Sequence, residues 1–186
     1  MRIVAGRHRG RTLVAPKEHS TRPTADRTRQ ALFNVLEHAA WTPDIQDARV
    51  ADLFAGSGAL GLEALSRGAA SCVFVENDAT ALAALTQNIA TLRLEAQTEV
   101  RRADATRPLS LPAPVDIAFL DPPYAQGAVE PALAHLASGA VLAMDAIVVV
   151  ERGIGEPPLT APGFTVVDSR AWGAARVWFL KRSDPP

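Results

Sequence analysis

The amino-acid sequence predicts an α/β fold built on a mostly parallel, doubly wound sheet that closes with an antiparallel hairpin. From residue 48 onward, short apolar runs alternate with helical patterns, which is typical of parallel strands buried between helices. Near the C-terminus, the runs 164–169 and 176–181 are joined only by residues 170–175, too short a connection for a parallel crossover. The length of 186 residues suits one domain with a small appendage.

The individual elements follow from local patterns. Residues 2–4 and 11–14 are expected to form two short strands, and Thr24 to cap a helix that ends before Pro43. Further strands are expected at 49–54, 72–76, 98–102, 115–120 and 146–150, and helices at 59–67, 78–93 and 128–137. We therefore expect a hairpin and helix over 1–44 and the α/β domain over 45–186.

Charge is distributed unevenly along the chain. The net charge is −1, yet residues 1–30 carry eight basic and two acidic side chains. A basic arm on an acidic body favours a polyanionic partner, although a merely solvated terminus has the same composition. The candidate phosphate contacts are Arg7, Arg9, Arg11, Arg22, Arg27 and Arg29.

Several classes of protein are disfavoured by composition. No apolar stretch approaches the ~20 residues that span a bilayer, and no apolar core follows the first charges, so we expect neither a membrane protein nor an export signal. With Cys72 as the single cysteine and four scattered histidines, no disulfide or metal site is expected. We expect a cytoplasmic monomer.

A glycine-rich loop follows the predicted strand 49–54. Gly56, Gly58 and Gly61 match G-x-G-x-x-G, and Glu76 ends the next strand, where an acid can bind ribose hydroxyls. By itself the pattern fits NAD, FAD or S-adenosylmethionine, or a purely structural turn.

Two acids favour S-adenosylmethionine over a dinucleotide. Asp52, just before the glycines, would repel a pyrophosphate but not a sulfonium or an amino group. Asp104, after the third strand, can accept from an adenine amino group, although it can equally cap a turn. The expected cofactor contacts are Thr24, Asp52, Ala55, Gly56, Gly58, Glu76, Asn77, Asp104 and Ala105.

The motif Asp121-Pro122-Pro123-Tyr124 follows the strand 115–120, where open α/β sheets bind ligands. If the Asp121 carboxylate and the Pro122 carbonyl accept the two N–H groups of an exocyclic amine, its lone pair becomes available for methylation. Tyr124 offers a flat face for an extruded base. Asp121, Pro122 and Tyr124 are therefore the expected catalytic residues, although Asp-Pro-Pro also occurs as an ordinary turn.

Both motifs resemble those of the class I amino-methyltransferases with a Rossmann-like fold. The stretch 21–34, TRPTADRTRQALFN, and the opening RIVAG with Gly10-Arg11 are similar more specifically to the RsmD family. That resemblance implies methylation of the N2 amino group of a guanine in 16S rRNA, with the small ribosomal subunit or an assembly intermediate as partner. It also implies that the loop around Arg22–Thr24 closes over the cofactor.

Three alternatives remain open from the sequence. A DNA adenine-N6 methyltransferase would use the same Asp-Pro-Pro-Tyr motif, but 186 residues leave little room for a target-recognition domain. A nicotinamide-dependent oxidoreductase would explain the glycine loop and not Asp121–Tyr124. A non-catalytic RNA-binding protein would explain only the basic arm.

Overall fold

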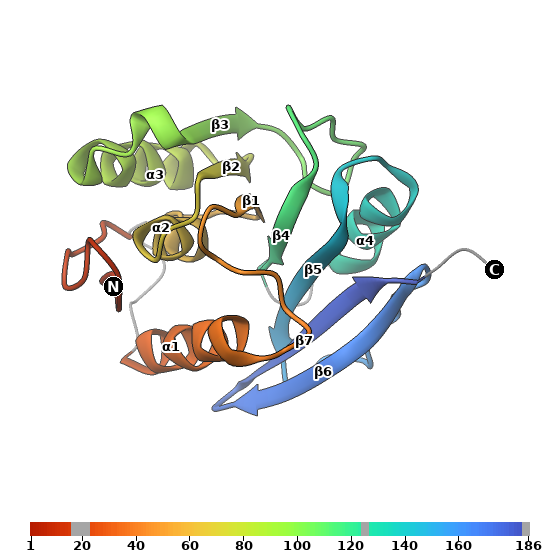
Figure 1. Ribbon diagram of the computed structural model, residues 1–186. Helices are drawn as coiled ribbons and strands as arrows, with labels where there is room; N and C mark the ends of the chain where they lie inside the picture. Colours follow the sequence, from red (N-terminus) through yellow and green to blue (C-terminus); the bar gives the residue numbers. More distant parts are fainter. Residues whose placement is uncertain (16–22, 124–126, 184–186) are drawn as a thin grey trace.

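The computed structural model describes residues 1–15, 23–123 and 127–183, with the backbone alone for 23–25 (Figure 1). Its strands are β1 (Arg49–Leu53), β2 (Ser71–Glu76), β3 (Thr98–Arg102), β4 (Val115–Leu120), β5 (Leu142–Gly153), β6 (Phe164–Trp172) and β7 (Ala175–Arg182). Its helices are α1 (Pro23–His38), α2 (Ala59–Ser66), α3 (Ala79–Leu92) and α4 (Val129–Ser138), with a 3-10 turn η1 (Glu95–Gln97).

All seven strands form one sheet in the order β3-β2-β1-β4-β5-β7-β6. The first five strands are parallel, and β7 pairs antiparallel with both β5 and β6. The predicted Rossmann-like sheet with a C-terminal antiparallel hairpin is confirmed. The order reverses between β1 and β4, and ligands bind at such a switch point in open α/β sheets.

The helices cover both faces of the sheet. Figure 1 shows α1, α2 and α3 on one side and α4 on the other. One buried cluster lies beneath α1–α3 and includes Phe33, Leu62, Leu85 and Phe119. A second lies beneath α4 and includes Leu133. Alternate residues along the central strands point into one cluster or the other.

Two of the expected element boundaries are wrong at the ends of the chain. α1 begins at Pro23, so Thr24 lies within its first turn and does not cap it; the fixed φ of proline suits the first helical position. At the other end, β6 and β7 extend to a turn at Gly173-Ala174, because the register continues to Trp172↔Ala175.

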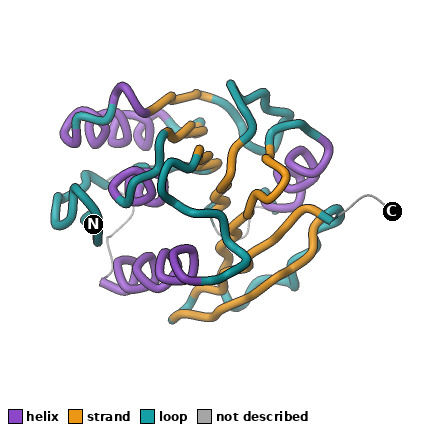
Figure 2. The backbone as a smooth tube through the Cα atoms, in the orientation of Figure 1, coloured by secondary structure: helices purple, strands orange, loops and turns teal. Residues whose placement is uncertain are grey.

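The N-terminal segment forms one antiparallel bridge, Arg2↔Thr12, in place of two predicted strands. Figure 2 draws this segment as loop. The ladder stops because the amides of Val4 and Ala5 donate to the carboxylate of Glu63 on α2, at 2.7 and 2.9 Å, and not to a neighbouring strand. Ile3 and Leu13 are nevertheless buried in the cluster beneath α1–α3. The division of the chain at residue 44 stays a prediction.

No helix among the described residues is long and apolar enough to cross a membrane. Within the same residues, no group of three or more His, Cys, Asp or Glu side chains is arranged to hold a metal ion.

Candidate active site

The glycine loop between β1 and α2 is held by two strand-end acids. Asp52, almost fully buried, accepts a hydrogen bond from the Gly61 amide at 2.9 Å. Glu76 at the end of β2 accepts from the Gly56 amide at 2.8 Å. Gly58 is the N-cap of α2. Both acids that the sequence assigned to the cofactor thus also fix the shape of the loop.

Two of the glycines have separate physical roles. Gly56 has φ +54°, and a Cβ there would meet nothing within 4 Å, so its face is open. Gly61 faces the sheet, where a Cβ would lie 2.4 Å from the Phe74 ring. The first leaves room beside the backbone, and the second lets α2 pack closely on β2.

The adenosine side of the predicted pocket is formed by the ends of β2 and β3. The second Glu76 oxygen accepts from the amides of Asn77 and Asp78, both at 2.8 Å. Asp104 accepts from the Thr106 amide at 2.9 Å and from its hydroxyl at 2.6 Å, and these bonds lower the pKa of Asp104. Asp104 therefore caps a turn while remaining partly accessible, which leaves both of its predicted roles possible.

Three other residues expected to contact the cofactor lie in the described part of the chain, near the ends of β1, β2 and β3. Ala55 donates its amide to the Val75 carbonyl at 3.0 Å, and Ala105 is buried. Asn77 is exposed beside Glu76. The Thr24 side chain lies outside the described residues.

Asp121 lies at the carboxyl end of β4, next to the strand that carries Asp52. Burial raises the pKa of Asp121 to about 6. The pKa of Asp52 rises to about 7, mainly by burial, with contributions from the charges of Asp121 and Glu76. Pro122 and Pro123 follow and line a small cavity, whereas Tyr124 lies outside the described residues.

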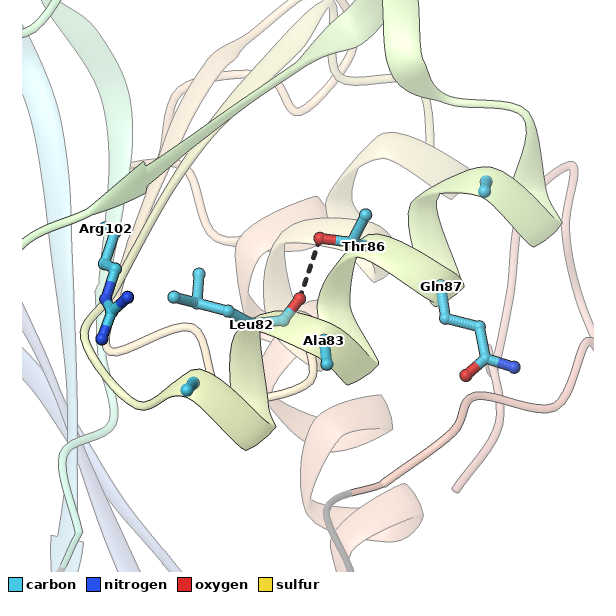
Figure 3. Close-up of a pocket in the computed structure, with 7 residues that line it drawn as sticks. Leu82, Ala83, Thr86, Gln87 and Arg102 are labelled. Carbon is cyan, nitrogen blue, oxygen red and sulfur yellow. Dashed lines mark hydrogen bonds between the residues drawn. The ribbon is translucent and has the colours of Figure 1, made fainter.

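A shallow depression on the surface lies between α3 and the end of β3, where Arg102 is the register partner of Glu76. Figure 3 shows Leu82, Thr86 and Arg102 at its edges. We assign no ligand to it.

The basic arm packs on α2 and is held mainly by its backbone. The Arg7 amide donates to the Ser66 carbonyl, and its guanidinium donates to the Leu65 carbonyl at 3.0 Å. Arg9 and Arg11 are exposed, as is Arg27 on α1. Arg22 lies outside the described residues.

Arg29 is a correction to the predicted phosphate contacts. Only 4% of its side chain is exposed, and it lies 2.8 Å from Asp26 and 3.6 Å from Glu63. A guanidinium enclosed in this way cannot reach a phosphate in this conformation. The helical pattern placed Arg29 in a basic cluster without indicating that it faces inward.

Two structural residues near the site were missed by the sequence reading. Glu63, fully buried, receives the arm amides and lies 2.8 Å from the Arg67 guanidinium. Asn88, also buried, donates to the Ser57 carbonyl of the glycine loop and to the Val14 carbonyl of the arm, both at 2.9 Å. Polar residues on the otherwise apolar faces of predicted helices were the available signal.

The sheet is mostly parallel, and two strand-end acids hold a glycine turn at its carboxyl edge. Asp-Pro-Pro follows β4 at the switch point. Together these features define the class I methyltransferase fold and site. Comparison with known proteins specifies the family. The model of a family described as "Conserved hypothetical protein 95" matches residues 1–181. The chain belongs to this family, the RsmD family.

Relatives in two bacteria carry the name "Ribosomal RNA small subunit methyltransferase D". The Escherichia coli K12 protein is 39% identical over 87% of this chain and 79% of its own length. The Haemophilus influenzae protein is 36% identical over 93% of this chain and 89% of its own. The solved structure of yhhF from Escherichia coli, described as a candidate methyltransferase, superimposes with a TM-score of 0.82 at 33% identity, over 98% of this chain and 97% of that one.

Proposed function

We propose that this protein transfers a methyl group from S-adenosylmethionine to the exocyclic N2 amino group of a guanine in 16S rRNA of the small ribosomal subunit. The observation that carries the proposal is the match over residues 1–181, which includes both the glycine loop and the Asp-Pro-Pro-Tyr motif. Relatives named as small-subunit rRNA methyltransferases support the substrate.

The residues at the sheet edge fit the proposed cofactor. S-adenosylmethionine, when bound, supplies an electrophilic methyl group on a sulfonium sulfur. The open face at Gly56 leaves space for a ligand, and Glu76 stands beside it to accept from ribose hydroxyls. Burial, with the nearby charges of Asp121 and Glu76, raises the pKa of Asp52, and a cationic ligand at this edge of the sheet would favour its charged form.

Asp121, Pro122 and Tyr124 are proposed to hold the acceptor base. The Asp121 carboxylate and the Pro122 carbonyl accept the two N–H groups of the amine and orient its lone pair, while Tyr124 stacks on the ring. Positioning and local charge would supply most of the rate enhancement.

The arm is proposed to contact rRNA phosphates through Arg7, Arg9, Arg11 and Arg27, joined by Arg22. Arg9, Arg11 and Arg27 are exposed, and the arm is fixed to α2, so their positions are set relative to the catalytic body. We propose that the protein acts as a monomer in the cytoplasm.

Incubation with tritiated S-adenosylmethionine and either small subunits, their assembly intermediates or duplex DNA tests the proposal. Small subunits lacking the modification, or their assembly intermediates, should accept label on guanine N2, identified after nuclease digestion. Label on adenine N6 of duplex DNA would favour the DNA methyltransferase alternative. Failure of all acceptors, with intact cofactor binding, would refute the proposed substrate.

A further inference from the structure

Glu151 on β5 lies beside the catalytic motif, although the sequence did not single it out. Val50, Phe119 and Val149 all point into the cluster beneath α1–α3. Because side chains alternate along a strand, Asp52, Asp121 and Glu151, each two residues further on, face that same side. Three carboxylates from neighbouring strands therefore share one face at the carboxyl edge of the sheet.

Asp121 and Glu151 are neighbours across the β4–β5 pair. The last register pair between these strands is Leu120↔Val150, so the next positions along each are Asp121 and Glu151. Adjacent strands lie about 4.8 Å apart, which brings the two side chains together. Glu151 also lines the small cavity bordered by Pro122 and Pro123.

Two charged groups on neighbouring elements affect the pKa of Glu151: Asp121 on β4 and Arg29 on α1. Its register partner on β7 is the uncharged Val177. Arg152, the next residue, is paired with Glu130 and Glu156. Burial and the charge of Asp121 raise the pKa of Glu151 to about 8, against a smaller opposing effect of Arg29.

We propose that Asp121 and Glu151 act as a carboxylate pair that takes up the proton lost by the acceptor nitrogen on methylation. This rests on the proposed function. A lone exposed carboxylate is a weak base, whereas two adjacent, partly desolvated carboxylates hold a proton near neutral pH. Pairs of this kind are how proteins place an acid and a base at one site.

The step balances in charge and in atoms. The nitrogen lone pair forms the bond to the methyl carbon, and the carbon–sulfur bond breaks with its electrons left on sulfur. The nitrogen's proton passes to a carboxylate oxygen of the pair. One positive charge on sulfur and one negative charge on the pair disappear together, so the net charge of the site is unchanged.

The pair has a signature that does not depend on activity. Burial and the charge of the neighbouring carboxylate favour one proton shared by the pair in the free protein near neutral pH, and a bound sulfonium should displace it. Titration calorimetry of S-adenosylmethionine into the full chain, in two buffers of different ionisation enthalpy, should show release of about one proton. Glu151→Gln should sharply reduce this release and leave only the share of Asp52, whereas Glu95→Gln, at an exposed glutamate in η1, should keep it in full.

Single-turnover methylation of small subunits tests the catalytic consequence. We expect Glu151→Gln to slow transfer by about tenfold to a hundredfold, below the full effect of general acid–base catalysis because Asp121 remains. Because the bound cofactor already displaces the pair's proton at pH 7, the wild-type rate at saturating cofactor should fall only as the pH drops below 7. This limb should shift to lower pH in the variant, where Asp121 has no neighbouring carboxylate at position 151.

Each outcome bears on one proposal. Glu151→Gln with wild-type proton release and an unchanged pH profile would overturn the pair. If that variant does not fold, Asp121→Asn decides: it should lower the pKa of Glu151 and so reduce proton release at pH 7, and unchanged release would overturn the pair. A wild-type protein that binds no S-adenosylmethionine would instead refute the proposed function.

Discussion

Glu76 holds three backbone amides with one carboxylate, those of Gly56, Asn77 and Asp78. Its proposed role in binding the cofactor therefore cannot be separated from its role in shaping the loop. A variant without this carboxylate loses the hydrogen bonds that hold the loop as well as any contact with the ligand.

We predict that Glu76→Ala weakens S-adenosylmethionine binding by at least about 1.5–3 kcal/mol, the scale of a lost hydrogen bond to a charged group. Glu76→Gln should lose less, because its amide oxygen can still accept from Gly56. Calorimetry measures both variants. Wild-type affinity in Glu76→Ala would place the ribose elsewhere.

Asp121 is expected to act mainly on the acceptor base. Asp121→Ala should reduce methyl transfer by about 10²-fold or more, the lower range for a removed transition-state contact, while cofactor affinity changes little. Initial rates on small subunits and calorimetry measure the two effects. Near-normal turnover in Asp121→Ala would contradict the positioning mechanism.

For Tyr124, replacement by Ala should reduce methyl transfer severely and replacement by Phe only mildly, because stacking needs the ring more than the hydroxyl.

At the scale of elements, Glu63 joins the N-terminal segment and α1 to α2. Its oxygens accept from Val4 and Ala5 and contact Arg67 at 2.8 Å and Arg29 at 3.6 Å. The Nε of Arg29 has no hydrogen-bond partner in the described structure and lies 3.6 Å from the Glu63 carboxylate, while its Nη2 pairs with Asp26.

Glu63→Ala should therefore lower the free energy of unfolding by about 3–5 kcal/mol, because it removes the buried carboxylate that lies between two buried cations. Glu63→Gln keeps an acceptor for the amides and should cost less. Urea denaturation gives the difference, with the exposed Glu95→Ala as the control. A loss no larger than that of the control would show that the buried ion pairs contribute little to stability.

The exposed arginines of the arm offer a cleaner RNA test than the whole basic cluster. Arg7 bonds to α2, so its removal would disturb the arm, whereas Arg9 and Arg11 are exposed. Replacing these two with Ala should weaken RNA binding and flatten its log–log salt dependence by about 1.5, at roughly 0.7–0.9 for each phosphate that is no longer neutralised.

Cofactor affinity should be unchanged in that double variant. Arg49→Ala, at the amino end of β1, removes a cation that is not part of the arm and that is paired with Asp116, and it should leave the salt slope as in the wild type. If the double variant kept the wild-type slope, the arm would be a solvated surface.

At the scale of the whole molecule, the acids gathered at the sheet edge make stability depend on pH. Asp52 titrates near 7 when folded and near 4 when unfolded, so the folded state binds its proton more tightly. The free energy of unfolding therefore contains a contribution that falls as pH rises from about 4 to about 7 and is constant above that.

We predict that Asp52→Asn removes this part of the pH dependence, up to about 4 kcal/mol at roughly 1.4 kcal/mol for each pKa unit. The asparagine oxygen can still accept from Gly61. Relative to wild type, the variant should gain stability at pH 8 compared with pH 5, measured by urea denaturation at both. Parallel behaviour of the two proteins would mean that Asp52 is not the group responsible.

Sequence reasoning and structure agree where local patterns are strong. The apolar strands, the glycine turn and the C-terminal hairpin follow from periodicity and connection length, and all are present. They disagree at the N-terminus, where the Val4 and Ala5 amides donate to Glu63 and not to a strand. They also disagree at Arg29, which is buried although it was predicted to contact phosphate. Both departures depend on contacts made across 34 to 59 residues, which no local pattern encodes.

By itself, the sequence determined the order of strands and helices, the positions of the glycine loop and the Asp-Pro-Pro motif, and the family, because these depend on short-range spacing and residue chemistry. The tertiary structure alone decided which charges are buried together. Arg29 is buried because α1 packs on α2 over Glu63. Glu151 lies beside Asp121 because β5 pairs with β4 in one particular register. Such neighbours are set by packing, and packing brings together residues that lie far apart in the chain.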